Sequence, residues 1–220
     1  MPALVLLLAA LVLPAHDSDA KAPIARGGTV KALFFGDSLM TGTGTRPTRP
    51  VMARVAGRIL GWQVTVDGWG GTGFTTGGKR GLPYRERLSA PGVLSTPYDV
   101  VLLEGGTNDR AADLDDLRDR VVETVDYVQE RLPNTRVVLM GAFNPRTHRY
   151  DERRNGVDRV LREIAVERDI PFFSPLSGNW AKGQGPRFLT GDGLHPTAYG
   201  YGVMGVRLAA ELRDLDISSS

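Results

Sequence analysis

The chain of 220 residues contains no cysteine, and this absence excludes several kinds of protein. Disulfide bonds, thiolate metal sites and acylation of a lipoprotein-type cysteine all require a thiol. Histidine is scarce as well, since the chain has only His16, His148 and His195. Because His16 lies in an N-terminal segment that we expect to be removed, two histidines remain. We therefore predict neither a metal site nor another cofactor.

Strong charge is also missing. The formal net charge is +2, which is too small to indicate a nucleic-acid partner. The arginine-rich stretch at residues 146–154 includes two carboxylates, so we interpret it as a solvated loop and helix start. A composition of 41% hydrophobic and 24% charged residues is that of an ordinary globular protein, and the length predicts one domain. The sequence carries no signal of oligomeric state.

No apolar run is long enough to cross a membrane. The longest, residues 3–13, is far shorter than the roughly 20 residues that a spanning helix needs. Small residues follow it, so residues 1–20 predict a secretory signal peptide cleaved near Ala20. No lysine or arginine precedes the run, which leaves a retained anchor or a buried N-terminal element as alternatives. We expect a secreted or cell-envelope protein without a stable membrane span, with a linker at residues 21–29.

Apolar strand-like segments alternate with helix-like segments after this linker. The expected strands are residues 30–35, 63–66, 100–104, 136–141 and 170–173, and the expected helices are residues 50–60, 114–132, 151–168 and 197–212. Helical spacing is clear at Leu117, Val121 and Val125. Continuous apolar strands between helices are typical of a parallel sheet covered on both faces. We therefore predict an α/β domain at residues 30–215, a three-layer α/β/α sandwich with about five strands and a flavodoxin-like outline.

A serine follows the first expected strand. Ser38 lies in the run Gly36-Asp37-Ser38-Leu39, directly after the apolar residues 30–35. Open α/β folds keep their sites at the carboxyl ends of parallel strands. A serine hydroxyl is a weak nucleophile at neutral pH and needs an adjacent base. Gly-Asp-Ser alone is also a common turn sequence, so this motif requires partners.

A base for such a serine is present in the C-terminal part of the chain. Asp192 precedes His195 by three residues, so one turn can bring its carboxylate to the imidazole. That contact fixes the tautomer of the histidine and stabilises the imidazolium. The same sequence, Asp-Gly-Leu-His-Pro, also fits a simple turn before a helix, with Pro196 near the helix start.

Hydrolysis of an ester also needs hydrogen-bond donors for the developing oxyanion. Asn108 offers a side-chain amide after the third expected strand, and Gly70 and Gly71 offer backbone N–H groups after the second. The N–H of Ser38 is a further candidate. Each motif alone is explained equally well as a turn or a helix cap. Together, a nucleophile, a base with its carboxylate and oxyanion donors indicate a serine esterase.

On these motifs the chain resembles the SGNH hydrolases, also called GDSL esterases and lipases, over roughly residues 30–212. The resemblance implies a catalytic triad of Ser38, Asp192 and His195 and an oxyanion hole of Ser38, Gly71 and Asn108. Glycines crowd the segment that carries Gly71, so Gly70 is its alternative. The resemblance also implies a three-layer fold and a broad choice of ester substrates.

Two further glycine motifs overlap in the loop after the second expected strand. Residues 68–73 fit G-x-G-x-x-G, and residues 73–79 fit the G-x-x-x-x-G-K start of a phosphate-binding loop. Both motifs require a following helix, which the next glycines and Pro83 disfavour. The second motif also has Arg80 where Mg²⁺ binding needs Ser or Thr. We interpret the segment as an irregular loop near the serine.

Aromatic residues are few, at 7%, and three of them lie in loops near the motifs. Trp69 and Phe74 belong to the glycine loop, and Trp180 belongs to the long loop at residues 174–191 that precedes Asp192. We expect all three to bind substrate and the long loop to form one wall of the cleft. Ordinary packing of the loops is an equally good explanation for the aromatic side chains.

The resemblance implies a carboxylic ester hydrolase that works through an acyl-enzyme. We expect an exported serine esterase acting on short acyl or acetyl groups of a small molecule or a polysaccharide. A lipase or lysophospholipase, or an acyltransferase that passes the acyl group to a sugar, is possible with the same site. The alternative from another class is a non-catalytic carbohydrate-binding or cell-wall-binding protein.

Overall fold

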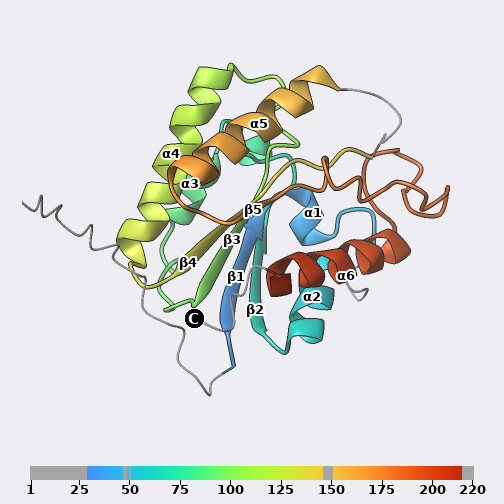
Figure 1. Cartoon of the computed structure of the whole chain (residues 1–220), viewed down its shortest axis with the longest axis horizontal. Helices are drawn as coiled ribbons and strands as arrows, with labels where there is room; N and C mark the ends of the chain where they lie inside the picture. Colours follow the sequence, from blue (N-terminus) through green and yellow to red (C-terminus); the bar gives the residue numbers. More distant parts are fainter. Residues whose placement is uncertain (1–28, 47–48, 50, 146–150, 215–220) are drawn as a thin grey trace, which may run out of the picture.

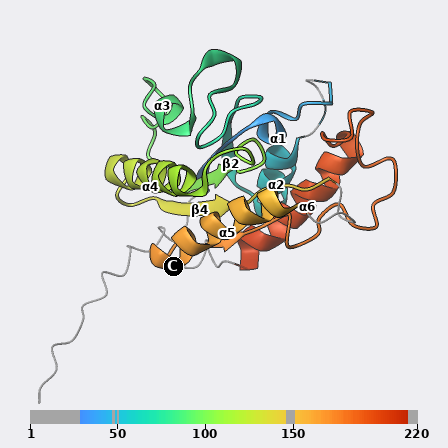
Figure 2. The same ribbon diagram turned by 90° about the horizontal axis from the view of Figure 1, so that it is seen from above.

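The computed structural model describes residues 29–46, 49, 51–145 and 151–214. The expected signal peptide and its cleavage position, most of the linker and His148 lie outside the described residues. A five-stranded sheet runs through the middle of the molecule, and helices cover both of its faces (Figures 1 and 2). The expected three-layer α/β/α arrangement is therefore confirmed.

All strands of the sheet are parallel, in the order β2-β1-β3-β4-β5, which is flavodoxin-like. Their bounds are Lys31–Gly36 for β1, Gln63–Gly68 for β2, Val100–Glu104 for β3, Arg136–Met140 for β4 and Phe172–Phe173 for β5. Strand β3 is buried at every position, as a strand covered on both faces must be. Strand β5 is shorter than expected, because Pro171 before it has no N–H to pair.

The helices divide between the two faces of the sheet. The first face carries α1 (Ser38–Thr41), α2 (Met52–Leu60) and α6 (Ala198–Asp214), and the second carries α3 (Tyr84–Leu88), α4 (Leu114–Arg131) and α5 (Glu152–Glu167). Alternate strand residues face each set, because side chains alternate along a strand. Phe34 packs in the apolar cluster with α2 and α6, whereas Phe35 packs with α3, α4 and α5. Figure 2 shows these layers edge-on.

The sequence pattern did not predict α1, α3 or the 3₁₀ helix Gly78–Arg80. All three are short and are fixed by local contacts rather than by an apolar period. Helix α1 begins because the Asp37 carboxylate accepts from the Leu39 N–H at 2.8 Å, and it ends at Gly42, where φ is 76°. No long helix opens directly after β2, so the glycine motifs there lack the helix that nucleotide binding requires.

Candidate active site

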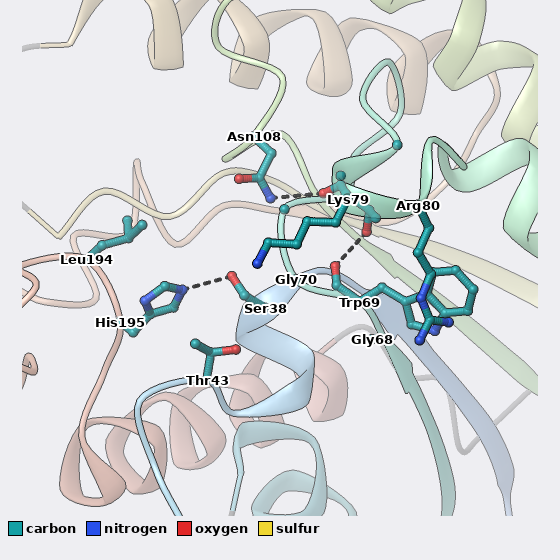
Figure 3. A pocket seen from close by; sticks show the side chains of 14 residues that line it. Ser38, Thr43, Gly68, Trp69, Gly70, Lys79, Arg80, Asn108, Leu194 and His195 are labelled. Atoms are coloured by element: carbon teal, nitrogen blue, oxygen red, sulfur yellow. Dashed lines mark hydrogen bonds between the residues drawn. The ribbon is translucent and has the colours of Figure 1, made fainter.

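Ser38 lies just beyond the end of the interior strand β1, at the carboxyl edge of the sheet (Figure 3). Strand β1 closely approaches both β3 and α1 here, because a Cβ at Gly36 would lie 2.3 Å from Glu104 Oε2 of β3 and 2.7 Å from Met40 Cγ of α1. Asp37 caps α1 and so sets Ser38 in its first turn. The serine is 9% exposed and lines a cavity. The sequence therefore places a nearly buried hydroxyl at the edge where a ligand can reach it.

His195 and Asp192 reach the serine from a tight loop before α6. The Thr190 N–H donates to the His195 carbonyl oxygen at 2.8 Å, which closes the loop. Asp192 Oδ2 lies 2.7 Å from His195 Nδ1, and His195 Nε2 lies 3.0 Å from Ser38 Oγ. Nδ1–H therefore donates to the carboxylate, and Nε2 accepts from the serine hydroxyl. The three residues form one hydrogen-bonded chain, although 157 positions separate Ser38 from His195.

The Asp192 carboxylate is held in its charged form although its side chain is 49% exposed. Hydrogen bonds from the His195 ring, the Leu194 N–H, the Thr190 hydroxyl and the His195 N–H lower the pKa of Asp192 well below its ordinary value. The residue is therefore a carboxylate throughout the neutral range. A fixed negative charge at Nδ1 favours an imidazolium at His195.

The glycine turn after β2 presents two backbone donors to the same cavity. Residues Trp69 to Thr72 form a turn closed by a 3.3 Å hydrogen bond from the Thr72 N–H to the Trp69 carbonyl oxygen. Gly71 occupies its third position with a φ of 75°, which favours glycine. Neither Gly70 nor Gly71 donates its N–H to an acceptor within the described part of the chain. A Cβ at Gly70 would lie 3.8 Å from Ser38 Cβ, so Gly70 stands beside Gly71 as a candidate donor.

Asn108 reaches the cavity from the segment after β3, but both of its amide hydrogens already have acceptors. Nδ2 donates to Asp37 Oδ2 at 2.8 Å and to the Thr72 carbonyl oxygen at 2.9 Å (Figure 3). Donation to an oxyanion requires one of these bonds to open or to be shared. The sequence motifs do not reveal that the Asn108 amide hydrogens have acceptors, because these two acceptors lie 71 and 36 positions away in the sequence.

Buried carboxyl groups lie beneath the serine, and the sequence motifs give no role to them. Asp37 and Glu104 are fully buried, and the Asp37 N–H donates to Glu104 Oε2 at 3.1 Å. Desolvation raises the pKa of Asp37 to about 6 and raises the pKa of Glu104 well above its ordinary value. Burial therefore favours the protonated form of Glu104, whereas Asp37 Oδ2 accepts from Asn108. The signal in the sequence was an acidic residue at the end of an apolar strand.

Of the three aromatic side chains expected to bind substrate, the structure brings only Trp69 to the cavity. Phe74 is fully buried, with its ring centroid 4.9 Å from that of Tyr84. Trp180 is 2% exposed and stacks on Phe173 with a centroid distance of 6.1 Å. The expectation of substrate contact is therefore wrong for Phe74 and Trp180, which are core side chains. The loop at residues 174–191 likewise contributes no residue to the cavity lining.

The cavity that opens at Ser38 has a volume of about 810 Å³. The described residues that line it are Ser38, Thr43, Gly68, Trp69, Gly70, Gly71, Thr72, Gly77, Gly78, Lys79, Arg80, Asn108, Leu194 and His195. Within this set Leu194 is the only aliphatic side chain beyond threonine methyl groups. The exposed surface of this lining is nevertheless more apolar than polar, because Trp69, Leu194 and the carbon atoms of the other residues contribute to it.

No three His, Cys, Asp or Glu side chains in the ranges that the structure describes are grouped so that they could hold a metal ion. None of the helices in those ranges combines the length and the apolar character needed to span a membrane.

A serine, an imidazole and a carboxylate joined by hydrogen bonds at the carboxyl edge of a parallel sheet are the arrangement of a serine hydrolase. The model of the GDSL-like lipase/acylhydrolase family matches residues 34–203, and the chain belongs to this family. The expected resemblance is confirmed. Membership of this family makes the protein a carboxylic ester hydrolase.

Solved structures of esterases and lipases share the fold. The lipase/acylhydrolase from Enterococcus faecalis is 20% identical, with a TM-score of 0.64 over 85% of this chain and 97% of that one. The family two carbohydrate esterase from Clostridium thermocellum, solved with cellohexaose, is 19% identical, with a TM-score of 0.68 over 88% of this chain and 67% of that one. Esterase EstA from Pseudoalteromonas sp. is 14% identical, with a TM-score of 0.67 over 84% of this chain and 97% of that one. At these identities the likeness shows the fold alone. A search of curated protein sequences finds no match.

Proposed function

We propose that this family member is an exported serine esterase that removes short acyl groups through an acyl-enzyme. The observation that carries the proposal is the hydrogen-bonded chain from Asp192 through His195 to Ser38, which ends at an open cavity. A nucleophile, a base and an orienting carboxylate in this geometry are what acyl transfer needs.

The proposed reaction has two steps. His195 Nε2 takes the proton of Ser38 as Oγ attacks the ester carbonyl carbon, and the imidazolium then protonates the departing alcohol. In the second step His195 deprotonates a water molecule, which attacks the acyl-enzyme, and the imidazolium returns this proton to Ser38 Oγ as its bond to the acyl group breaks and the carboxylic acid is released. The oxyanion of each tetrahedral intermediate is bound by the N–H groups of Ser38 and Gly71 and by Asn108 once one of its present bonds opens.

The lining of the cavity supports a short acyl group. Glycine, threonine and charged side chains make up most of it, and Leu194 gives the one aliphatic side chain. Each methylene of a fatty chain contributes about 0.8 kcal/mol of favourable free energy when it is buried, and burial requires contact with apolar surface. Trp69 and Leu194 are the only large apolar side chains of the described lining, which suits an acetyl or similar group, and the dependence of turnover on acyl length separates an esterase from a lipase. The carbohydrate esterase among the structural neighbours is consistent with a saccharide ester.

Export follows from the segment at residues 1–20, which we propose is a cleaved signal peptide. In a bacterial host with a secretion system, the mature protein is expected to begin at Lys21. Intact mass analysis of the exported protein checks this, and a periplasmic or secreted product that retains Met1 would contradict cleavage.

The first test measures hydrolysis of 4-nitrophenyl acetate, butyrate and decanoate by the chain that begins at Lys21. We expect turnover that decreases from acetate to decanoate and falls by roughly three to six orders of magnitude in Ser38→Ala. Near-normal turnover by a folded Ser38→Ala variant would contradict the assignment. Faster hydrolysis of the decanoate would favour a lipase.

The competing proposal, a carbohydrate-binding protein without turnover, makes a different prediction for a fluorophosphonate probe. An activated serine reacts covalently with such a probe, so the wild-type chain is expected to be labelled and Ser38→Ala is not. A wild-type protein that neither hydrolyses the esters nor reacts with the probe would favour the binding protein.

The acyltransferase alternative is tested by the products. If both a sugar ester and a free acid accumulate, product analysis measures the share of acyl groups that are transferred to the sugar.

A further inference from the structure

The glycine loop that resembles a phosphate-binding loop in sequence brings two cations to the cavity. Lys79 and Arg80 belong to the 3₁₀ helix Gly78–Arg80, and both line the cavity. Figure 3 shows the Lys79 side chain extending into the cavity with its amino end toward Ser38. Arg80 lies beside Trp69, on the side of Ser38 away from His195.

The backbone that carries these cations is packed against the proposed oxyanion turn through contacts that only glycine permits. Thr72 pairs with Gly77 across the loop. A Cβ at Gly77 would lie 2.2 Å from the carbonyl carbon of Gly81, and a Cβ at Gly78 would lie 2.9 Å from the Gly70 carbonyl oxygen. The backbone that carries both cations therefore has a fixed position beside the proposed oxyanion turn.

Trp69 anchors the guanidinium of Arg80 in the cavity wall. The guanidinium carbon of Arg80 lies 4.2 Å from the centroid of the Trp69 ring. Arg87 also contacts that ring, at 4.8 Å, but it is 2% exposed and its charge is neutralised by Asp67 at 2.7 Å. Of the two guanidinium groups on Trp69, Arg80 is thus the one whose charge faces solvent and substrate.

The charge of Lys79 and Arg80 is not balanced inside the cavity. The described lining residues include no carboxylate, and neither cation forms a salt bridge with any residue that the structure describes. Other surface arginines do pair with carboxylates, for example Arg118 with Glu163. The nearby Asp192 lies behind His195 and is hydrogen-bonded to it. Two cations without a carboxylate partner on the wall of a concave site attract an anionic group to that wall.

We propose that Lys79 and Arg80 form a subsite for a carboxylate, so that the natural substrate is a short-acyl ester of an acidic sugar. This inference rests on the proposed esterase function. The Arg80 guanidinium can bind a carboxylate through paired N–H groups, whereas the Lys79 ammonium, which lies nearer Ser38 in Figure 3, adds a point charge across the cavity. An anionic phospholipid also carries negative charge, but the described lining gives its fatty chain only two large apolar side chains, Trp69 and Leu194, and Arg80 covers the Trp69 ring.

The test compares two acetyl esters that differ in charge, 4-acetoxybenzoate and 4-acetoxybenzamide. The quantity measured is the ratio of kcat/KM for the anionic ester to kcat/KM for the neutral one, at low ionic strength. We expect this ratio to fall at least tenfold in Lys79→Gln/Arg80→Gln, mainly through the KM of the benzoate. The ratio of the wild type is also expected to decrease in about 0.5 M NaCl, because salt screens exposed charges.

A matched variant separates local from overall charge. Lys182→Gln/Arg213→Gln removes the same two charges from exposed positions that do not line the cavity, and its ratio is expected to stay within about twofold of the wild type. An unchanged ratio in the Lys79/Arg80 double variant, with Ser38-dependent turnover of the neutral ester retained, would overturn the subsite alone. Absence of Ser38-dependent turnover of both esters in the wild type would overturn the esterase proposal and the inference with it.

Polymer and lipid substrates then test the sugar assignment. We expect the wild type to release acetate faster from acetylated polygalacturonate than from acetylated xylan, and the difference to disappear in Lys79→Gln/Arg80→Gln. Release of fatty acid from lysophosphatidylglycerol that depends on the same two residues, without acetate release from the polygalacturonate, would overturn the assignment to an acidic sugar.

Discussion

The two oxygens of Asp192 have separate tasks. Oδ1 accepts from the Leu194 N–H and the His195 N–H, each at 2.9 Å, and so holds the loop. Oδ2 faces His195 Nδ1 at 2.7 Å and so fixes the tautomer of the ring. Loop conformation and proton transfer can therefore be separated by a substitution that changes one oxygen and keeps the other.

Asp192→Asn is such a substitution. An asparagine keeps one oxygen for the loop N–H groups, but its NH₂ cannot accept from Nδ1–H, so the ring turns to the tautomer with the proton on Nε2. That nitrogen then no longer accepts from Ser38, and we expect kcat/KM to fall by roughly 10²- to 10⁴-fold. Because the side chain is half exposed, Tm is expected to change by no more than about 2 °C.

Steady-state kinetics on 4-nitrophenyl acetate and a thermal scan of the same sample check this prediction. A variant that keeps kcat/KM within about threefold of the wild type would show that the carboxylate does not set the tautomer. A large loss of Tm would instead show that the loop, rather than the chemistry, depends on the charge.

At the scale of the elements, the contact between α2 and α6 is the most extensive one between two helices of the first face. Gly205 of α6 permits it, because a Cβ there would lie 2.5 Å from Val55 Cβ and 2.9 Å from the Met52 carbonyl oxygen of α2. Gly202, on the same helix, has open space within 4 Å of an added Cβ. The Thr190–His195 loop leads directly into α6, so this contact also supports the position of the imidazole.

The same change at these two glycines is expected to have opposite effects. Gly205→Ala forces the helices apart and is expected to lower the free energy of unfolding by about 1–3 kcal/mol. Gly202→Ala only restricts the unfolded chain and improves helix propensity, so it is expected to raise that free energy by about 0.5–1 kcal/mol. Urea denaturation of the two variants and the wild type measures both values. Equal effects of the two substitutions would contradict the close packing at Gly205.

At the scale of the whole molecule, the buried pair of Asp37 and Glu104 links global stability to pH. Glu104 loses its proton near its ordinary pKa of 4.5 in the unfolded chain, whereas burial raises its pKa well above this in the fold. At a pH between these two pKa values, the folded chain binds one proton more than the unfolded chain. The free energy of unfolding therefore decreases as the pH rises through this range. A difference of one bound proton corresponds to about 1.4 kcal/mol per pH unit.

Glu104→Gln is expected to weaken this dependence. The amide does not titrate and has the shape of the protonated carboxyl, so the variant should lose less stability than the wild type between pH 5 and pH 8. Glu130→Gln makes the same chemical change at an exposed position of α4 and is expected to follow the wild type. The free energy of unfolding in urea at each pH measures this. Parallel curves for Glu104→Gln and the wild type would contradict the protonated state of Glu104.

Much of the fold could be predicted because continuous apolar runs are stable only when both faces of a strand are covered. Strand β3 was expected at residues 100–104 and has these bounds, and the long helices begin and end within one or two residues of their expected positions. Short elements such as α1 and α3 were missed, because a single turn carries no apolar period. Their positions depend on capping and on contacts with distant residues.

The sequence by itself determined the sheet, its layers and the chemical identity of Ser38, Asp192 and His195, because strand order brings the carboxyl ends of parallel strands to one edge. Only the tertiary structure decided that Phe74 and Trp180 are core residues and that the Asn108 amide is occupied. The physical reason is that burial, hydrogen-bond partners and protonation depend on which distant segments cover a side chain. Local patterns do not encode those neighbours.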